Sequence, residues 1–340
     1  EFDKNLQGKT YTYPWKELGR MVSTKLGWQG LTKHESGMFC VDAVYHYVDI
    51  CAARYIRDKH AQMDAVYAYE DGALRTFQEA KRYGKTCFYE LPIGYWRAMR
   101  ELLEEERQKN PAWAMTLGGF QDSDTKLTRK NQELALADRI FVASSFTKRT
   151  LQWFPERLSD VVVVPYGFPP VNRERIYQPW KGRKIKLLFV GGLSQRKGIS
   201  YLFEAVDGLE QAVELTVVGS GAINACPALQ KALAKVHYVP SLPHSEVLKL
   251  MAEHDLLLFP SLFEGFGLVV TEAMSQGTPV VTTDRTCGPD VITHGKDGWI
   301  FPAGTSEPIK ELLERLIAQP DMLQQVGEAA RQTATARPWK

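Results

Sequence analysis

Two glutamates frame a glycine turn in residues 260–273 of this 340-residue chain. Glu264 directly precedes Gly265, and Glu272 stands eight positions after Glu264. The turn follows a continuous apolar run, residues 256–259, which is typical of a strand buried on both faces of a parallel sheet. Such sheets bind ligands at the carboxyl ends of their strands, where glycines leave backbone N–H groups uncovered at the start of a helix. The segment therefore predicts a diphosphate site flanked by carboxylates that can accept hydrogen bonds from sugar hydroxyls.

A second glycine turn places two cations after another strand-like run, residues 185–190. Gly191 and Gly192 end the run, and Arg196 and Lys197 follow. Two positive charges at a strand end can offset a diphosphate and stabilise it as a leaving group. Taken alone, the segment also fits an ordinary basic surface loop. Likewise, Glu264 alone would fit a helix cap and Glu272 a surface charge, but the glycine turn between them favours ligand contacts.

The order of apolar and amphipathic stretches predicts two Rossmann-like, doubly wound parallel α/β domains. The residues between 165 and 183 contain three prolines in the first six positions and no strand or helix pattern. We therefore expect an N-terminal domain over residues 1–170, a linker over 171–183 and a C-terminal domain over 184–340. The expected strands are 65–69, 86–90, 139–143, 161–164, 185–190, 213–218, 236–239, 256–259 and 280–283, and the expected helices include 41–56, 126–137, 198–206 and 268–276.

The two ends of the chain differ from a complete doubly wound pair. No strand followed by a glycine-rich turn opens the sequence, and residues 336–340 stop directly after a helix. We expect both termini to be incomplete. The alternative is that the first domain simply begins with helices.

The segment 260–273 resembles the Glu-(seven residues)-Glu motif of the family-4 retaining glycosyltransferases, also called group 1. The resemblance extends through residues 279–283 and 294–299 and covers essentially residues 185–318. It implies the GT-B fold, two Rossmann-like domains facing a cleft, with a nucleoside-diphosphate sugar on the C-terminal domain and an acceptor on the N-terminal domain. It also implies that Glu264 contacts hydroxyls of the donor sugar and Glu272 the ribose diol, with the amides of Phe266, Gly267 and Leu268 along the sugar and diphosphate.

The same resemblance assigns further positions. Lys197 matches a family lysine, whereas Gly191-Gly192 stands where the family usually has Gly-Arg, which makes Arg196 the candidate replacement. Gly219 resembles the next glycine turn near the nucleotide, and Val239 is expected beside the base, read through its backbone.

Acidic residues end two strands of the first half. Many family members carry a histidine facing the anomeric carbon where this chain has Glu90. A carboxylate there could hold a hydroxyl or relay a proton, or it could be held by a helix N-terminus. The same two alternatives apply to Glu70 and Asp71.

The implied function is a retaining, metal-independent transfer of sugar from a UDP- or GDP-sugar to a glycan, lipid-linked or small-molecule acceptor in bacterial-type glycan synthesis. Two alternatives stay open: a nucleotide-sugar epimerase of the same architecture, and a non-catalytic sugar-nucleotide-binding subunit, which the unusual Glu90 keeps in view. We expect no cofactor and no metal ion. Asp122-Ser123-Asp124 matches an Asp-x-Asp metal signature, but it precedes an expected helix, where N-capping is the simpler role.

Composition indicates which partners and which cellular compartment to expect. The net charge of +2 comes from 42 basic and 40 acidic residues, and neither half of the chain forms a basic arm, so nucleic acid is not an expected partner. The five cysteines show no zinc spacing and fit a reducing compartment. We expect a cytoplasmic protein, with peripheral attachment to the inner face of a membrane left open.

Overall fold

The computed structural model describes residues 8–180 and 182–339. The first seven residues of the expected N-terminal domain, Lys181 of the expected linker and Lys340 lie outside the described residues. The strands are β1 (Ala65–Tyr69), β2 (Thr86–Leu91), β3 (Arg139–Val142), β4 (Asp160–Val163), β5 (Ile185–Val190), β6 (Val213–Val218), β7 (His237–Val239), β8 (Leu256–Phe259), β9 (Val280–Thr283) and β10 (Trp299–Phe301). The nine expected strands are confirmed to within one residue, and β10 was not predicted.

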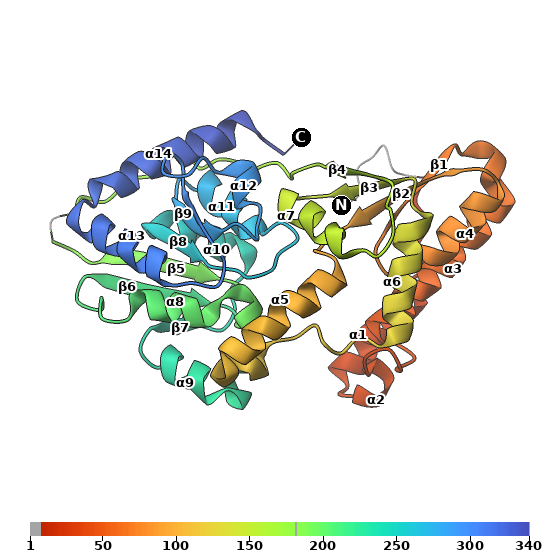
Figure 1. The fold of residues 1–340 in the computed structure, drawn as a ribbon, viewed down its shortest axis with the longest axis horizontal. Helices are drawn as coiled ribbons and strands as arrows, with labels where there is room; N and C mark the ends of the chain where they lie inside the picture. Colours follow the sequence, from red (N-terminus) through yellow and green to blue (C-terminus); the bar gives the residue numbers. More distant parts are fainter. Residues whose placement is uncertain (1–7, 181, 340) are drawn as a thin grey trace. The chain divides into compact units, whose positions relative to one another are not determined.

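Helices separate most of these strands, as expected for parallel α/β structure (Figure 1). The α-helices are α1 (Trp15–Lys25), α2 (Gln29–Thr32), α3 (Val41–Lys59), α4 (Leu74–Arg82), α5 (Trp96–Lys109), α6 (Asp124–Leu136), α7 (Ser145–Thr150), α8 (Ile199–Val206), α9 (Pro227–Leu233), α10 (His244–Glu253), α11 (Leu268–Ser275), α12 (Gly288–Val291), α13 (Glu307–Ala318) and α14 (Asp321–Ala336). None of the described helices is long and apolar enough to cross a bilayer.

The six-stranded sheet is doubly wound, with the order β10-β9-β8-β5-β6-β7. The chain starts at the centre with β5, runs outward to β7, and returns to β8 on the other side of β5 before running outward again. β5 and β8 pair in parallel, with Leu187 opposite Leu256 and Leu188 opposite Leu257. The reversal of strand order therefore lies between β5 and β8, and this is where open α/β sheets bind their ligands.

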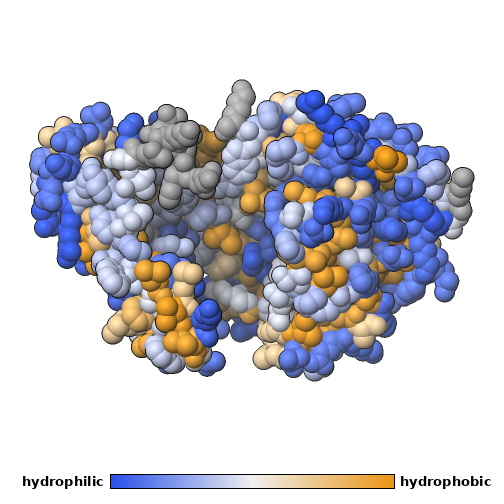
Figure 2. Space-filling model, turned by 180° about the vertical axis from the view of Figure 1, so that it is seen from behind, coloured by the Kyte–Doolittle hydropathy of each residue, from blue (hydrophilic) through white to orange (hydrophobic). Residues whose placement is uncertain are grey.

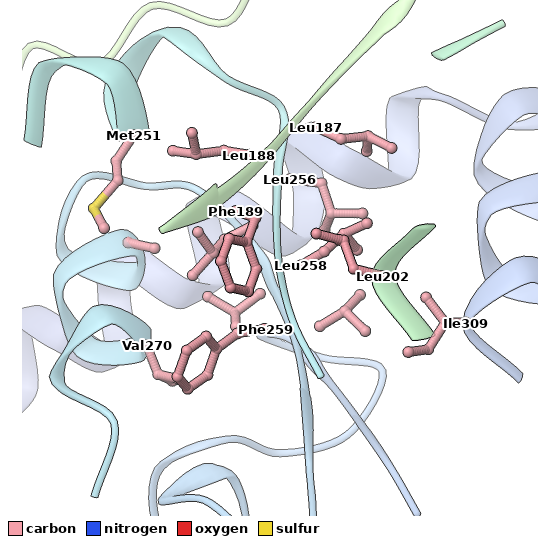
Figure 3. Close-up of a cluster of buried hydrophobic side chains, with 14 of the residues drawn as sticks. Leu187, Leu188, Phe189, Leu202, Met251, Leu256, Leu258, Phe259, Val270 and Ile309 are labelled. Atoms are coloured by element: carbon pink, nitrogen blue, oxygen red, sulfur yellow. The ribbon is translucent and has the colours of Figure 1, made fainter. Parts of the chain in front are cut away.

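Helices cover both faces of this sheet (Figure 1). The side chains of β5 and β8 are buried against them, and Figure 3 shows Met251 and Val270 to one side of the strands and Leu202 and Ile309 to the other. Burying each such side chain contributes about 1.5–3 kcal/mol. This double burial explains why the strands read as continuous apolar runs rather than as alternating ones.

The four-stranded sheet has the sequential order β1-β2-β3-β4, so its described strands contain no reversal. β1 and β2 are parallel, with Ala65 opposite Thr86 and Tyr69 opposite Glu90. α4 packs on β1 and β2, α6 on α4 and β2, and α3 on α4. Together with the six-stranded sheet, this confirms the predicted class of two parallel α/β sheets.

The chain forms two compact units that do not follow a simple division at residues 171–183. Unit 1 comprises residues 1–91, 122–141 and 156–162, and unit 2 comprises residues 92–121, 142–155 and 163–340. Two segments from the first half therefore belong with the six-stranded sheet. The expected linker also packs within unit 2, where Tyr177 donates a hydrogen bond to the carbonyl of Gly277. The functional domain boundaries stay a prediction.

The N-cap of α6 is Ser123 rather than either flanking aspartate. The Ser123 backbone is extended, and its hydroxyl accepts a hydrogen bond from the N–H of Lys126 at 3.3 Å. Asp122 lies one residue too early for this role and instead pairs with Lys126 at 3.2 Å and Lys130 at 3.6 Å. The segment Asp122-Ser123-Asp124 therefore does supply the N-cap, but through Ser123 and not through Asp122.

Ser123→Ala should lower the free energy of unfolding by about 0.5–2 kcal/mol, because the amide at the helix start loses its acceptor. Urea denaturation followed by circular dichroism measures this, with Ser123→Asn as a control that keeps a capping oxygen. A cost in the asparagine variant equal to that in the alanine variant would show that capping is not what Ser123 contributes.

Candidate functional site

Two turns meet at the reversal of strand order in the six-stranded sheet. One follows β5 and carries Arg196 and Lys197 in a 3-10 helix, Gln195–Lys197. The other follows β8 and carries Glu264. The Lys197 ammonium donates a hydrogen bond to Glu264 Oε1, and Arg196 Nη1 lies 3.5 Å from the same oxygen. Residues 67 positions apart in the sequence thus form one ionic cluster.

Glu264 is the buried member of the cluster, whereas Arg196 and Lys197 are partly buried, and the cluster carries an excess of positive charge. Glu264 is 7% exposed, and its Oε1 also accepts a hydrogen bond from Ser261 at 2.8 Å. Burial lowers the pKa of Lys197, and the neighbouring Glu264 opposes this shift. Two cations face a single carboxylate, so the site has a net positive charge suited to an anionic ligand.

The turn after β8 presents its backbone N–H groups. Among the described residues, the N–H groups of Gly265, Phe266, Gly267 and Leu268 make no hydrogen bond, whereas the four carbonyls all accept one. Gly267 has φ 92°, a left-handed conformation that strains residues with a side chain. Because α11 begins at Leu268, the free donors lie at the positive end of a helix dipole.

Side chains from the first half of the sequence hold this turn in place. Ser144 and Thr147 donate hydrogen bonds to the carbonyl of Gly265 at 2.6 and 2.9 Å. On the other side of Gly265, a Cβ atom would lie 1.8 Å from the carbonyl oxygen of Pro92, so no larger residue fits. Sequence reasoning missed Ser144 and Thr147 as parts of the site, although a serine before a helix was visible as a capping signal.

The other residues that were predicted to bind the sugar donor lie at the same edge of the sheet. They are Gly191, Gly192, Gly219 and Val239. Gly219 packs on Gly191 so closely that a Cβ atom on Gly219 would lie 1.8 Å from the Gly191 carbonyl oxygen. The N–H of Gly219 donates to the carbonyl of Val239 at 3.0 Å. Gly192 follows Gly191 in the turn after β5. The ends of β5, β6 and β7 are thus joined side by side.

Glu272 lies in α11, about one turn after Leu268, the last of the free amides. Its Oε1 is 3.0 Å from Nε2 of His244, the first residue of α10. The contact fixes the direction of the carboxylate from a neighbouring helix. Sequence reasoning did not anticipate His244 as a partner, because nothing local links the two helices.

A buried carboxylate in α5 anchors the turn after β5. Glu106 is 6% exposed and accepts hydrogen bonds from Gln195 Nε2 at 2.7 Å, from Tyr201 at 2.9 Å and from Asn110 at 2.6 Å. The backbone N–H of Gln195 donates to Thr116 at 2.8 Å. Gln195 directly precedes Arg196, so this network holds the two cations in position.

Glu90, Glu70 and Asp71 lie in unit 1. The Glu90 carboxylate accepts a hydrogen bond from the hydroxyl of Tyr67. Burial raises the pKa of Glu70 to about 7 against the opposing effect of Lys130, 3.5 Å away. The catalytic contribution of these carboxylates stays a prediction.

Within the described residues, one group of acidic and histidine side chains is close enough to hold a metal ion. His34, Glu35 and Asp122 place one ligand atom each within 4.8 Å of one another. The ammonium groups of Lys126 and Lys130 already face Asp122. Because these cations occupy the acidic cluster, we assign no ion to it.

Comparison with known proteins identifies the second half of the chain. Residues 170–333 match the family described as glycosyl transferases group 1. This part of the chain is similar to the group 1 glycosyl transferases. The matched residues contain both turns of the ionic cluster. The motif resemblance drawn from residues 260–273 is therefore confirmed at the level of the family.

Curated relatives agree with this family. An amylovoran biosynthesis glycosyltransferase of Erwinia amylovora is 31% identical over 45% of this chain and 40% of its own length. An MMP alpha-(1->4)-mannosyltransferase of Mycolicibacterium hassiacum is 30% identical over 64% of this chain and 53% of its own length. The chain thus spans about half the length of these relatives.

Solved structures share the fold at lower identity. The sucrose-phosphate synthase of Thermosynechococcus elongatus is 18% identical with a TM-score of 0.67, over 90% of this chain and 77% of that chain. The Anabaena protein HepE, solved in complex with UDP, is 19% identical with a TM-score of 0.63, over 84% and 77%. The chain therefore has the GT-B class of fold that its motifs imply.

Glu106→Ala should lower the free energy of unfolding by roughly 2–4 kcal/mol, because three buried donors lose their acceptor. It should also speed hydrogen exchange at the amides of residues 193–198, since Gln195 is released. Glu104→Ala, on the exposed side of the same helix, is the matched control. Unchanged exchange in that turn would show that Glu106 does not anchor it.

Proposed function

We propose that this chain forms the donor-binding part of a retaining glycosyltransferase, which moves a sugar from a nucleoside-diphosphate sugar to an acceptor hydroxyl. The observation that carries the proposal is the cluster of Arg196, Lys197 and Glu264 at the reversal of strand order, beside free amides at the start of α11. The match of residues 170–333 to the group 1 glycosyl transferases supports it.

The charges of the cluster match a diphosphate. The ligand carries about two negative charges, and the free amides together with the helix dipole add further attraction. When Lys197 and Arg196 turn toward phosphate, Glu264 loses its cationic partners and becomes free to accept a hydrogen bond from a sugar hydroxyl. A single cluster can thus exchange an internal ion pair for contacts to both halves of the donor.

The same groups supply the chemistry of the leaving diphosphate. As the bond between the anomeric carbon and the phosphate oxygen breaks, negative charge grows on the diphosphate. Positive groups that are already in place stabilise this charge without reorganisation. Glu264 and Glu272 hold sugar and ribose, which keeps the anomeric carbon in its reactive pose. Retention of configuration is proposed from the Glu264–Glu272 motif.

The names of similar proteins suggest which sugar nucleotide to test as the donor. HepE was solved with UDP and also with UDP-glucose, and another relative is named a mannosyltransferase. UDP is therefore the first nucleotide to test, with GDP and ADP beside it. We propose that unit 1 contributes the acceptor side through Glu90, near the end of β2, which accepts a hydrogen bond from Tyr67 in β1. We also propose that the reaction takes place in the cytoplasm or at the inner face of a membrane.

Glu272→Ala should weaken binding of the free nucleoside diphosphate by roughly ten- to a hundredfold, because a hydrogen bond to a charged acceptor is worth about 1.5–3 kcal/mol. Glu264→Ala should leave this affinity intact or raise it, because Lys197 is released for phosphate, and should still depress sugar transfer. A thermal-shift panel of UDP, GDP and ADP selects the ligand, and calorimetric titration then measures both variants.

The control for this pair is Glu246→Ala, an exposed glutamate of α10 that pairs with Lys249. Equal losses of diphosphate affinity in the Glu264 and Glu272 variants would contradict the separate assignments. Interconversion of a free sugar nucleotide without any acceptor would instead identify an epimerase.

Turnover should survive EDTA, because Lys197, Arg196 and the amides of the turn after β8 offset the charge of the diphosphate. The measurement is sugar transfer or donor hydrolysis before and after chelation. Asp122→Ala should leave the rate nearly unchanged as well. Loss of activity in EDTA that manganese or magnesium restores would refute metal independence.

A further inference from the structure

Helix α1 exposes its apolar face. Trp15 is 75% exposed, Met21 58% and Leu26 56%, and Leu18 and Val22 are also exposed. These positions follow the spacing of one helix face, which in a globular protein normally packs on the core. Here the apolar face of α1 points to solvent.

Small residues lie on the side of α1 that packs against the rest of the unit, next to the edge of the apolar face. Ser23 is buried, and Gly19 packs so closely on the ring of Phe39 that a Cβ atom there would lie 2.4 Å from it. The Lys16 ammonium reaches across to the carbonyl of Met38 at 3.0 Å. These contacts fix the rotation of the helix, so the outward direction of its apolar face is set by packing.

Neighbouring residues widen the exposed surface. Seven exposed side chains form a surface that we call the apolar patch: Trp15, Leu18, Met21, Val22, Leu26, Trp28 and Met38. Figure 2 shows apolar side chains gathered at the lower left, over the part of unit 1 that carries α1 and α2. Tryptophans stand at both ends of the patch, at the first residue of α1 and three residues after its last. Tryptophan prefers the boundary between water and lipid, because its ring is apolar and its N–H is polar.

The charge around the patch is one-sided. Residues 8–33 contain five basic side chains and one acidic side chain, a net charge of +4 in a chain whose total is +2. The acidic residue, Glu17, is already paired with Arg20 at 2.5 Å. Lys25 lies within the exposed face of α1, between Met21 and Leu18 around the helix. A surface that is apolar at its centre and basic at its rim is complementary to an anionic bilayer.

We propose that α1 and the apolar patch bind the surface of an anionic lipid bilayer, with the helix lying in the plane of the interface. Eleven residues of helix rise only about 16 Å, so α1 rests on the membrane and does not span it. A second copy of this chain is disfavoured as the occupant, because two such patches would bring like charges together. This proposal concerns unit 1 and holds whether or not the proposed sugar transfer is correct.

Vesicle flotation tests the proposal directly. The purified chain should float with vesicles containing 30% phosphatidylglycerol in phosphatidylcholine, and binding should fall as salt is raised, because exposed charges are screened. Binding to pure phosphatidylcholine should be much weaker. Absence of binding to the anionic vesicles at low salt would overturn the proposal.

Variants locate the contact. Leu18→Glu with Val22→Glu should reduce the partition coefficient about tenfold or more, and Lys25→Glu with Lys9→Glu should reduce it by a similar factor. Ile176→Glu, at an exposed apolar residue of unit 2, and Lys235→Glu are the matched controls and should bind normally. Losses in the controls equal to those in the α1 variants would overturn the assignment to α1.

The charged variants could lose binding because they misfold. A substitution that keeps the patch apolar provides a test that does not have this problem. Trp15→Phe with Trp28→Phe should still float, while quenching of tryptophan fluorescence by brominated lipid should fall. Unchanged quenching would show that these tryptophans do not enter the interface. Analytical ultracentrifugation supplies the competing outcome: a dimer in the parent chain that Val22→Glu dissociates would assign the patch to self-association and overturn the lipid proposal.

Discussion

The buried contact between Lys197, Arg196 and Glu264 joins the two central turns of the six-stranded sheet. A charge out of water is costly unless a partner of opposite sign and further hydrogen bonds compensate it. Glu264 therefore needs both cations and Ser261, and the cations need Glu264. An anion that meets the cations can replace this internal partner. The cluster therefore stabilises the fold, and its cations are also suited to the phosphate binding that we propose.

The turns of the cluster are held from outside the sheet. Ser144 and Thr147 hold the carbonyl of Gly265, and Glu106 holds Gln195. All three holding residues come from segments that precede the sheet in the sequence and belong to the same compact unit. With the carbonyls occupied in this way, the amides of residues 265–268 point toward a ligand. Positioned donors of this kind act in catalysis because they need no rearrangement when charge develops.

Unit 1 uses charge and apolar surface differently. Its interior contains carboxylates and lysines that neutralise one another, as in the pairing of Asp122 with Lys126 and Lys130. Its apolar residues in α1, by contrast, lie on the outside beside an excess of basic charge. Unit 2 thus concentrates positive charge at the proposed diphosphate site, whereas unit 1 places it around the apolar patch that we propose to bind a bilayer. Both proposed contacts depend on electrostatic attraction, and the proposed ligands differ in size and shape.

The sequence by itself determined the strands, the glycine turns and the acidic and basic residues within them. Strands buried on both faces are continuous apolar runs, and a turn such as Gly265–Gly267 depends on local backbone conformation, so both are visible locally. Only the tertiary structure decided that Lys197 meets Glu264, that Glu106 anchors Gln195, and that Ser123 and not Asp122 caps α6. β10, which directly follows the glycine-containing loop at residues 294–298, was missed. The outward rotation of α1 was also invisible, since a helical period identifies an apolar face but its direction depends on what the rest of the chain packs against.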